Sequence, residues 1–182
     1  MGGRDKGWIR FHNTPMVTWV IERLSPQVSD IIISANRHIK DYETFGYRVI
    51  SDDGSPSDEY QGPIAGIIPC LTHLNTDYGL IVPCDTPCLS PDLAKNLFGA
   101  ADSGKKLALY SVAGRIQPLF GLYHCDLVSS LKNYFEEGNR KLIRWCLEQD
   151  PHIVEFQGSE TAFFNVNTPL ELQQLENQVP DS

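Results

Sequence analysis

Hydrophobic residues recur along the chain with two spacings, one typical of helices and the other typical of buried strands. Met16, Val20 and Leu24 lie at helical spacing behind the segment 13–15, whose Asn-Thr-Pro sequence predicts a cap and a first turn for a helix over about 15–24. The segments 30–35 and 47–50 are short and rich in β-branched residues, and the first is typical of a strand buried on both faces.

The second half of the chain continues this alternation. Helical spacing predicts helices over about 63–74, 90–98, 125–136 and 140–148, with a last helix after Thr168. Apolar runs predict strands over 78–83, 106–112 and 119–123. Alternating strands and helices predict an α/β fold with three layers, in which helices cover both faces of a mostly parallel sheet. We expect a single domain over residues 1–182.

Composition and charge exclude several classes of function. The formal net charge of -8 disfavours general binding to nucleic acid or to anionic membranes, although a local cluster can still bind a small anion. No apolar run approaches the roughly 20 residues of a membrane span, and the N-terminus does not resemble a secretion signal. Five cysteines without a paired C-x-x-C spacing indicate a reducing compartment, so we expect a cytoplasmic protein.

Polar residues follow the predicted strands directly. Asn36, Asp52, Asp53 and Asp85 each come at the carboxyl end of a strand, where open α/β sheets bind their ligands. Asp85 lies between two prolines after a five-residue apolar strand, a setting that suits a Mg²⁺ ligand bridging nucleotide phosphates. The alternative for such an aspartate is a cap of a turn or helix.

The first residues of the chain combine two adjacent glycines, Gly2 and Gly3, with Lys6. Backbone N–H groups of a glycine loop together with a lysine are suited to wrapping phosphate oxygens. The segment does not match a Walker A motif, and a glycine pair at a chain end is often only flexible.

Five short segments carry a resemblance to one family. MGGRDKG, SANRH, GPIAG, PCDTP and FFNVNTP resemble, in order and approximate separation, motifs of the molybdenum cofactor guanylyltransferases, the MobA family. The resemblance runs from Met1 to about Leu175. It implies a Rossmann-like nucleotidyltransferase fold and the transfer of GMP from Mg-GTP to a molybdopterin, with pyrophosphate leaving.

The resemblance also implies a role for individual residues. Lys6 and Asp85 would be the catalytic pair, with Lys6 on the triphosphate and Asp85 holding Mg²⁺ against it. The remaining contacts to GTP would come from Gly2, Gly3, Asn36 and Asp52. The molybdopterin would be bound by Gly62, Gly66, Arg140, Asn165 and Asn167, with the neighbouring Lys141 as the alternative to Arg140. Partners beyond these two substrates would be proteins of cofactor biosynthesis and the molybdoenzymes that receive the product.

The sequence departs from the family at its beginning. Family members place a strand and an L-A-G-G segment ahead of the methionine that Met1 matches. That strand would be central, so we expect the sheet to lack its first strand, with exposed edges on the neighbouring strands and weakened GTP binding. Either the start was assigned at an internal methionine or the preceding residues were not included, or the chain is a degenerate copy. Retention of Lys6, Asp85, Asn165 and Asn167 favours the first explanation over a degenerate copy.

Three alternatives remain open from the residues. Asn165 and Asn167 could be turn formers ahead of a helix that begins at Thr168–Pro169. A cytidylyl- or sugar-nucleotide transferase would share the glycine-rich start and the strand-end aspartate, although the FFNVNTP ending favours the guanylyltransferase. A non-catalytic module that delivers molybdopterin is the alternative from another class.

Overall fold

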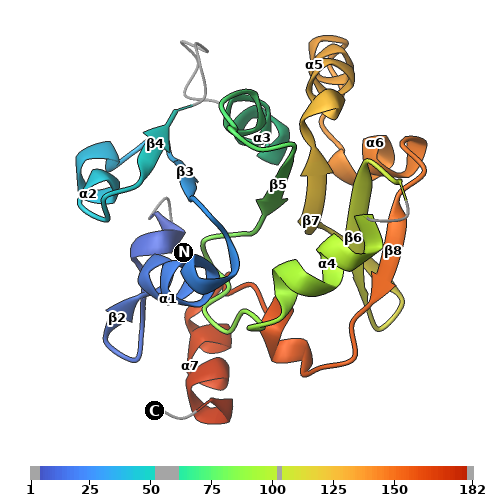
Figure 1. The fold of residues 1–182 in the computed structure, drawn as a ribbon. Helices are drawn as coiled ribbons and strands as arrows, with labels where there is room; N and C mark the ends of the chain where they lie inside the picture. The colour runs from blue at the N-terminus through green and yellow to red at the C-terminus, as the bar shows by residue number, and fades with distance from the viewer. Residues whose placement is uncertain (1–4, 52–61, 102–103, 180–182) are drawn as a thin grey trace.

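A computed structural model describes residues 5–51, 62–101 and 104–179, drawn in Figure 1. The first part comprises η1 (Lys6–Trp8), β1 (Arg10–Phe11), β2 (Thr14–Pro15), α1 (Met16–Leu24), η2 (Ser25–Gln27), β3 (Ile32–Ser34), α2 (Ile39–Glu43) and β4 (Arg48–Ile50). After the gap follow α3 (Pro63–Thr72), β5 (Tyr78–Ile81), α4 (Leu93–Ala101), β6 (Leu107–Val112) and β7 (Arg115–His124). The last part comprises η3 (Cys125–Leu127), α5 (Val128–Glu136), α6 (Leu142–Glu148), β8 (His152–Glu155), η4 (Glu160–Phe163) and α7 (Pro169–Gln178).

The strands of the described chain form two sheets beside the short β1–β2 pair. One has the order β5-β7-β6-β8, and the other consists of β3 and β4 paired in parallel. Strand β7 runs antiparallel to both of its neighbours, whereas β6 and β8 are parallel. The predicted α/β class is confirmed, and the sheet is mixed because the short turn between β6 and β7 makes a hairpin.

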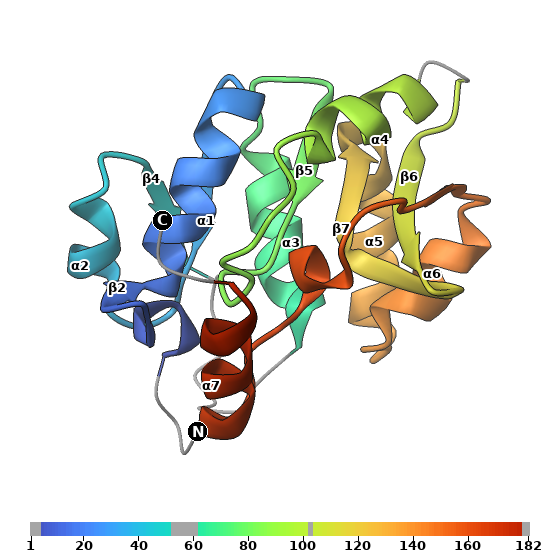
Figure 2. The ribbon, with the colours of Figure 1, turned by 90° about the horizontal axis from the view of Figure 1, so that it is seen from below.

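Two apolar layers lie on opposite faces of the larger sheet. Alternate residues of β6 point to opposite faces, so Ala108 and Tyr110 pack with α4 while Leu107 and Leu109 pack with α3, α5 and α6. Figure 2 shows α4 on the other side of the strands from α5 and α6. The three-layer arrangement predicted from the sequence is therefore confirmed.

The core of the larger sheet gives a testable expectation for stability. Leu109 is fully buried, and its truncation in Leu109→Ala leaves a cavity that we expect to lower the free energy of unfolding by about 2–5 kcal/mol. Leu147, on α6, is 54% exposed, so Leu147→Ala is the matched control and should leave stability nearly unchanged. Urea denaturation followed by circular dichroism measures both, and equal losses would contradict this assignment of the core.

Several local details differ from the sequence-based expectations, among them the short helix α2, which was not predicted, and β7, which begins four residues before the predicted strand. Helix α1 begins at Met16, and Pro15 is its N-cap without a side-chain hydrogen bond, because Thr14 and Pro15 pair with β1 instead. The strand β8 was not predicted, since its four residues carry no clear alternation. The predicted full burial of β3 was wrong: Ile32 and Ile33 are only half-buried, and in the described chain β3 is paired on one edge alone.

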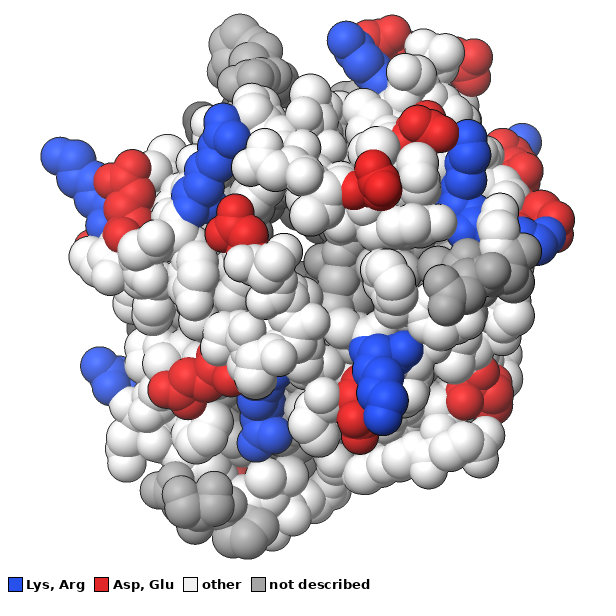
Figure 3. Space-filling model, in the orientation of Figure 1, with Lys and Arg blue, Asp and Glu red and all other residues white. Residues whose placement is uncertain are grey.

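Charged side chains are interspersed on the face drawn in Figure 3, with lysines and arginines beside aspartates and glutamates. On this face the lysine and arginine side chains do not gather into one patch. Among the described helices, none is long and apolar enough to cross a membrane.

Candidate functional site

Asp85 lies four residues beyond the end of β5, and hydrogen bonds of the surrounding backbone and of Thr86 fix its position. Only 6% of the residue is exposed, and the adjacent Thr86 is fully buried with its hydroxyl donating to the carbonyl of Pro83 at 2.9 Å. The carbonyl oxygen of Asp85 accepts a hydrogen bond from the backbone N–H of Val166 at 3.1 Å. The carboxylate of Asp85 is thereby fixed at the carboxyl end of the strand.

Lys6 joins this carboxylate to the C-terminal part of the chain. Its Nζ lies 3.2 Å from Oδ2 of Asp85 and 2.5 Å from Oδ1 of Asn167, two residues that are 79 and 161 positions away in sequence. The side chain of Lys6 is 42% exposed, against 8% for that of Asp85. We call Lys6, Asp85 and Asn167 the Lys6 cluster. It presents an ammonium group to solvent above a buried carboxylate.

A second aspartate positions the backbone that carries Lys6. Oδ1 of Asp5 accepts hydrogen bonds from the N–H of Gly7 at 3.1 Å and from the hydroxyl of Tyr42 at 2.7 Å. Burial, and then the bond to Asp5, raises the pKa of Tyr42 far above its ordinary value, so the phenol stays a donor. A Cβ on residue 7 would lie 2.5 Å from the oxygen of Tyr42, which explains the glycine there.

The Asn167 side of the cluster is fixed by the start of α7. Oε2 of Glu171 accepts the N–H groups of Asn167 and Thr168, both at 2.8 Å, and Thr168 completes a capping box with Glu171. The predicted cap at Thr168 and first helical position at Pro169 are confirmed. The segment therefore caps a helix and also places the amide oxygen of Asn167 on Lys6, while the contact of Asn165 and Asn167 with molybdopterin stays a prediction.

The Glu171 carboxylate predicts a pH dependence of stability. Its pKa is lowered from the ordinary 4.5 chiefly by the hydrogen bond from the Asn167 N–H, with further contributions from Thr168 and Lys6. A depressed folded-state pKa means that the stabilisation is complete above pH 4.5 and is lost as the pH falls through the folded value. Glu171→Gln should therefore lower the urea midpoint at pH 7, with a difference from the parent chain that shrinks on acidification. A difference that is constant with pH would contradict this.

Asn165 lies beside the Lys6 cluster. Its carbonyl oxygen accepts a hydrogen bond from Nδ2 of Asn167 at 3.1 Å. Its side-chain Oδ1 is buried and has no hydrogen-bond partner in the part of the chain that the structure describes. Since buried acceptors are normally satisfied, this atom is suited to a donor of a bound ligand.

The other predicted ligand residues lie around the beginning of α3. Gly62 is the N-cap of α3 with φ of +81°, a conformation that favours glycine, and a Cβ there would lie 4.0 Å from the carbonyl oxygen of Arg140. The guanidinium of Arg140 lies 4.0 Å from the centre of the Phe135 ring and donates to the Phe135 carbonyl at 2.9 Å. Gly62, Gly66 and the exposed Asn36 line one cavity between β3 and β5. Gly2, Gly3 and Asp52 lie outside the described residues, so their contacts stay predictions.

Three residues of the site were not predicted from the sequence. The spacing T-x-x-E is that of a capping box, so Glu171 could have been found from the sequence. Asp5 is adjacent to Lys6, but its role depends on Tyr42, which is 37 positions away. No local pattern marks Tyr42.

A metal ion has two places to consider in the described chain. His124, Cys125 and Asp126 offer ligand atoms within 4.8 Å of one another. Asp126, however, is paired with Lys106 at 2.7 Å, and Nδ1 of His124 accepts the Asp126 N–H at 3.1 Å. The second place is at Asp85, whose carboxylate contacts Lys6 as does the amide oxygen of Asn167. Carboxylate and amide oxygens are the ligands that Mg²⁺ prefers.

Comparison with known proteins gives relatives over nearly the whole chain. Residues 1–152 match the MobA-like NTP transferase domain. The molybdenum cofactor guanylyltransferase of Shewanella piezotolerans is 38% identical over 180 residues, which cover 98% of this chain and 87% of that protein. The corresponding protein of Shewanella halifaxensis is 40% identical over 176 residues, covering 96% and 86%.

Solved structures share the fold. Molybdopterin-guanine dinucleotide biosynthesis protein A from Archaeoglobus fulgidus superimposes with a TM-score of 0.78 at 21% identity, covering 97% of this chain and 91% of that one. The 2-C-methyl-D-erythritol 4-phosphate cytidylyltransferase of Thermus thermophilus gives a TM-score of 0.71 at 13% identity, covering 95% and 93%. At these identities the likeness establishes the nucleotidyltransferase fold alone.

Proposed function

Because the chain belongs to the MobA-like NTP transferase family, and to the molybdenum cofactor guanylyltransferases within it, we propose that it transfers GMP from GTP to molybdopterin. The resemblance found in the sequence motifs is thereby confirmed. The observation that best supports the proposed site is the Lys6 cluster, since it unites residues of three separate motifs at the carboxyl end of β5. Ligands of open α/β sheets bind at that edge.

The cluster has the chemistry for a magnesium nucleotide. A Mg²⁺ ion bound there would neutralise phosphate charge and orient the triphosphate. The carboxylate of Asp85 would be its protein ligand, and the ammonium of Lys6, already exposed above Asp85, would turn to the phosphate oxygens. Binding of the magnesium nucleotide would thus replace the ion pair between Lys6 and Asp85 by two contacts, one of Lys6 with the phosphate oxygens and one of Asp85 with Mg²⁺.

The transfer itself requires no covalent bond between the protein and the substrates. An oxygen of the terminal molybdopterin phosphate attacks the α-phosphorus of GTP, a new P–O bond forms there, and the bond to the β-phosphate breaks as pyrophosphate leaves. A phosphate nucleophile needs no general base. Residues that position two polyanions and stabilise charge on the α-phosphate therefore matter most, and these are Lys6 and Asp85.

The remaining predicted contacts divide between the two substrates. We assign Gly2, Gly3, Asn36 and Asp52 to GTP, and Gly62, Gly66, Arg140, Asn165 and Asn167 to molybdopterin. The adjacency of Gly62 and Arg140 supports a common role for these two, and the unsatisfied Oδ1 of Asn165 supports a ligand contact near Asn167. All five cysteines are free thiols, which supports a cytoplasmic location.

Isothermal titration with Mg-GTP, using Mg-CTP and Mg-ATP as controls, tests the proposed function. We expect selective binding of GTP, followed by release of pyrophosphate when molybdopterin is added. Preference for CTP would indicate a cytidylyltransferase, as for the structural relative from Thermus thermophilus. Molybdopterin binding without any nucleotide binding would indicate the delivery module.

A further inference from the structure

The backbone on either side of Lys6 is held by hydrogen bonds within η1. Asp5 is the N-cap of η1, and its carboxylate accepts the N–H of Gly7 at 3.1 Å. The carbonyl oxygen of Lys6 accepts the N–H of Ile9 at 3.1 Å. A lysine side chain has a flexible four-carbon stem, so its ammonium returns to one point only if its Cα is fixed. The conformation of η1 therefore decides whether Lys6 reaches the other two members of the Lys6 cluster.

Tyr42 is joined to η1 through the same carboxylate. Its hydroxyl donates to Oδ1 of Asp5 at 2.7 Å, and only 3% of Tyr42 is exposed. This oxygen is also the acceptor for the N–H of Gly7, so one atom connects the tyrosine to the backbone of η1. Hydrogen bonds to a charged group are stronger than those between neutral groups. Without the hydroxyl, the carboxylate that caps η1 would lose its buried donor and could turn away.

Ring contacts join η1 to α2 independently of this hydrogen bond. The ring of Trp8 lies 5.2 Å from that of Tyr42 and 5.8 Å from that of Phe45, measured between centroids. Distances in this range are typical of favourable aromatic pairs. Tyr42→Phe would keep these ring contacts and remove the hydrogen bond to Asp5 alone.

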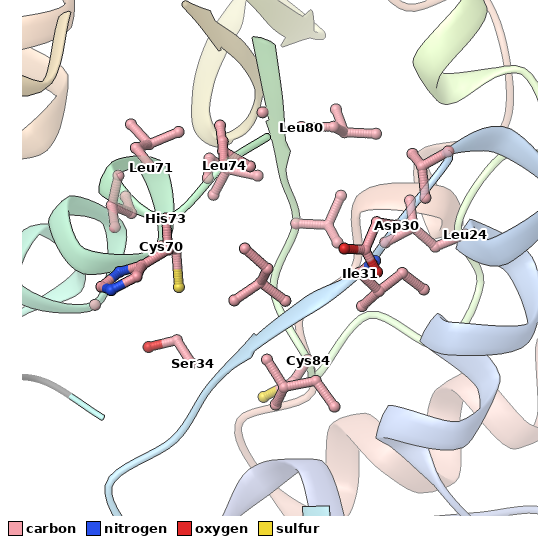
Figure 4. Close-up of a pocket in the computed structure, with 18 of the residues that line it drawn as sticks. Leu24, Asp30, Ile31, Ser34, Cys70, Leu71, His73, Leu74, Leu80 and Cys84 are labelled. Atoms are coloured by element: carbon pink, nitrogen blue, oxygen red, sulfur yellow. The ribbon is translucent and has the colours of Figure 1, made fainter. Parts of the chain in front are cut away.

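The helix that carries Tyr42 begins near the end of the sheets where the Lys6 cluster lies. Figure 4 shows Ser34, the last residue of β3, and Cys84, which precedes Asp85, on the same side of the cavity between β3 and β5. From Ser34 the chain continues into α2, and from Cys84 it continues directly into Asp85. The contact of α2 with η1 therefore lies at the edge where Lys6 meets Asp85.

We propose that Tyr42 is a positioning residue for the transfer reaction, which acts through Asp5 to hold η1 so that the ammonium of Lys6 stays above Asp85. The proposal rests on the proposed function and adds to it a residue that touches neither substrate. A mobile η1 would place the ammonium on the reacting phosphate only part of the time. Since misplacement of a charge affects the transfer more than the binding, the loss of Tyr42 lowers kcat rather than raising KM.

Tyr42→Phe measures this contribution. We expect kcat for pyrophosphate release from GTP to fall by roughly 10- to 100-fold, the effect of removing a residue that supports a reactive group, with a much smaller change in KM. Tyr110→Phe is the matched control, because Tyr110 is fully buried and its hydroxyl donates to the carbonyl of Leu93 at 3.1 Å. It should lower the urea midpoint to a similar extent and leave kcat unchanged. An unchanged kcat in Tyr42→Phe, or equal losses in both variants, would overturn the proposal.

Variants of Asp5 and Lys6 separate position from charge. Asp5→Asn keeps an oxygen that can accept from Gly7 and Tyr42, so it should retain most of the rate, whereas Asp5→Ala should lose it. If Asp5→Asn loses as much as Asp5→Ala, the charge of Asp5 is required and the proposal is wrong. In the Lys6→Met background, Tyr42→Phe should cause no further loss, because its effect passes through Lys6.

Reaction of the lysines with acetic anhydride tests the positioning of Lys6 without any nucleotide. In the parent chain the ammonium of Lys6 is held by Asp85 and Asn167, so Lys6 should be acetylated slowly, and Tyr42→Phe should accelerate this reaction. Lys106 is the control within the same chain, and its rate should not change. Mass spectrometry of peptides measures both rates, and an unchanged rate at Lys6 would overturn the proposal. A parent chain that releases no pyrophosphate from GTP would instead contradict the proposed function, while the acetylation still reports on Lys6.

Discussion

Replacing Asp85 by asparagine is expected to lower the rate of pyrophosphate release by roughly 100- to 1,000-fold, the effect of removing one preorganised electrostatic contact from a closed site. The substitution keeps the shape of the side chain and an oxygen near Lys6, but it removes the charge that would hold Mg²⁺. Since only 6% of Asp85 is exposed, water cannot readily replace that charge. The rate should be measured as a function of Mg²⁺ concentration, and the saturation curve should shift to higher concentration.

Asp126→Asn is the matched control for this experiment. Asp126 also pairs with a lysine, Lys106 at 2.7 Å, but it is exposed and follows β7, opposite the amino end of β5. Its replacement should leave the rate and the Mg²⁺ dependence unchanged. A full rate in Asp85→Asn, or an equal loss in both variants, would remove Asp85 from the proposed role.

The fold could be predicted from the sequence where the periodicity is strong. Helix α1 and strands β4, β5 and β6 begin and end within a few residues of the predicted positions, because apolar residues recur at one clear spacing in each. The failures have physical causes. Strand β3 is only half-buried because, in the described chain, it pairs on one edge alone. Helix α1 starts at Met16 because Thr14 and Pro15 pair with β1, and a pattern of capping residues cannot predict such a pairing.

The candidate site could be predicted only in part, for the same reason. The position of Asp85 after an apolar strand and that of Lys6 beside a glycine pair were visible in the sequence, and Asn167 was predicted as a ligand residue through the family resemblance. Their mutual contacts join residues up to 161 positions apart, and such contacts are decided by tertiary packing. The support from Tyr42 and Glu171 was not predicted, because a buried tyrosine and a helix cap are ordinary structural features until their partners are known.

Replacing Lys6 by methionine is the second change with a large expected effect. Methionine keeps most of the length and the apolar stem of the side chain while removing the ammonium group that lies between Asp85 and Asn167. We expect kcat/KM for GTP to fall by roughly 100- to 1,000-fold, as for the loss of another electrostatic contact to the phosphates. Lys106→Met removes an exposed lysine from a similar ion pair and serves as the matched control.

Measuring kcat and KM separately shows whether the ammonium of Lys6 acts in substrate binding or in the transfer step. If Lys6 binds the triphosphate equally before and during the transfer, KM rises and kcat is unchanged, whereas stabilisation of charge that develops on the α-phosphate lowers kcat. The exposed position of the ammonium above a buried carboxylate favours the second result, because the group can follow the phosphate as the pyrophosphate leaves. Lys6→Arg should recover part of the rate, since a planar guanidinium keeps the charge but changes its geometry.

The double variant Asp85→Asn with Lys6→Met tests whether the two residues act on one bound nucleotide. Side chains in contact are energetically coupled, and Lys6 and Asp85 are 3.2 Å apart. In the Lys6→Met variant the triphosphate is already poorly positioned against the Mg²⁺ ion that Asp85 would hold, so removing the carboxylate as well should add less than it does in the parent chain. The double variant should therefore lose less activity than the product of the two single losses. Strict multiplicativity would mean that the two groups act independently, and the Lys6 cluster would not be a single phosphate-binding centre.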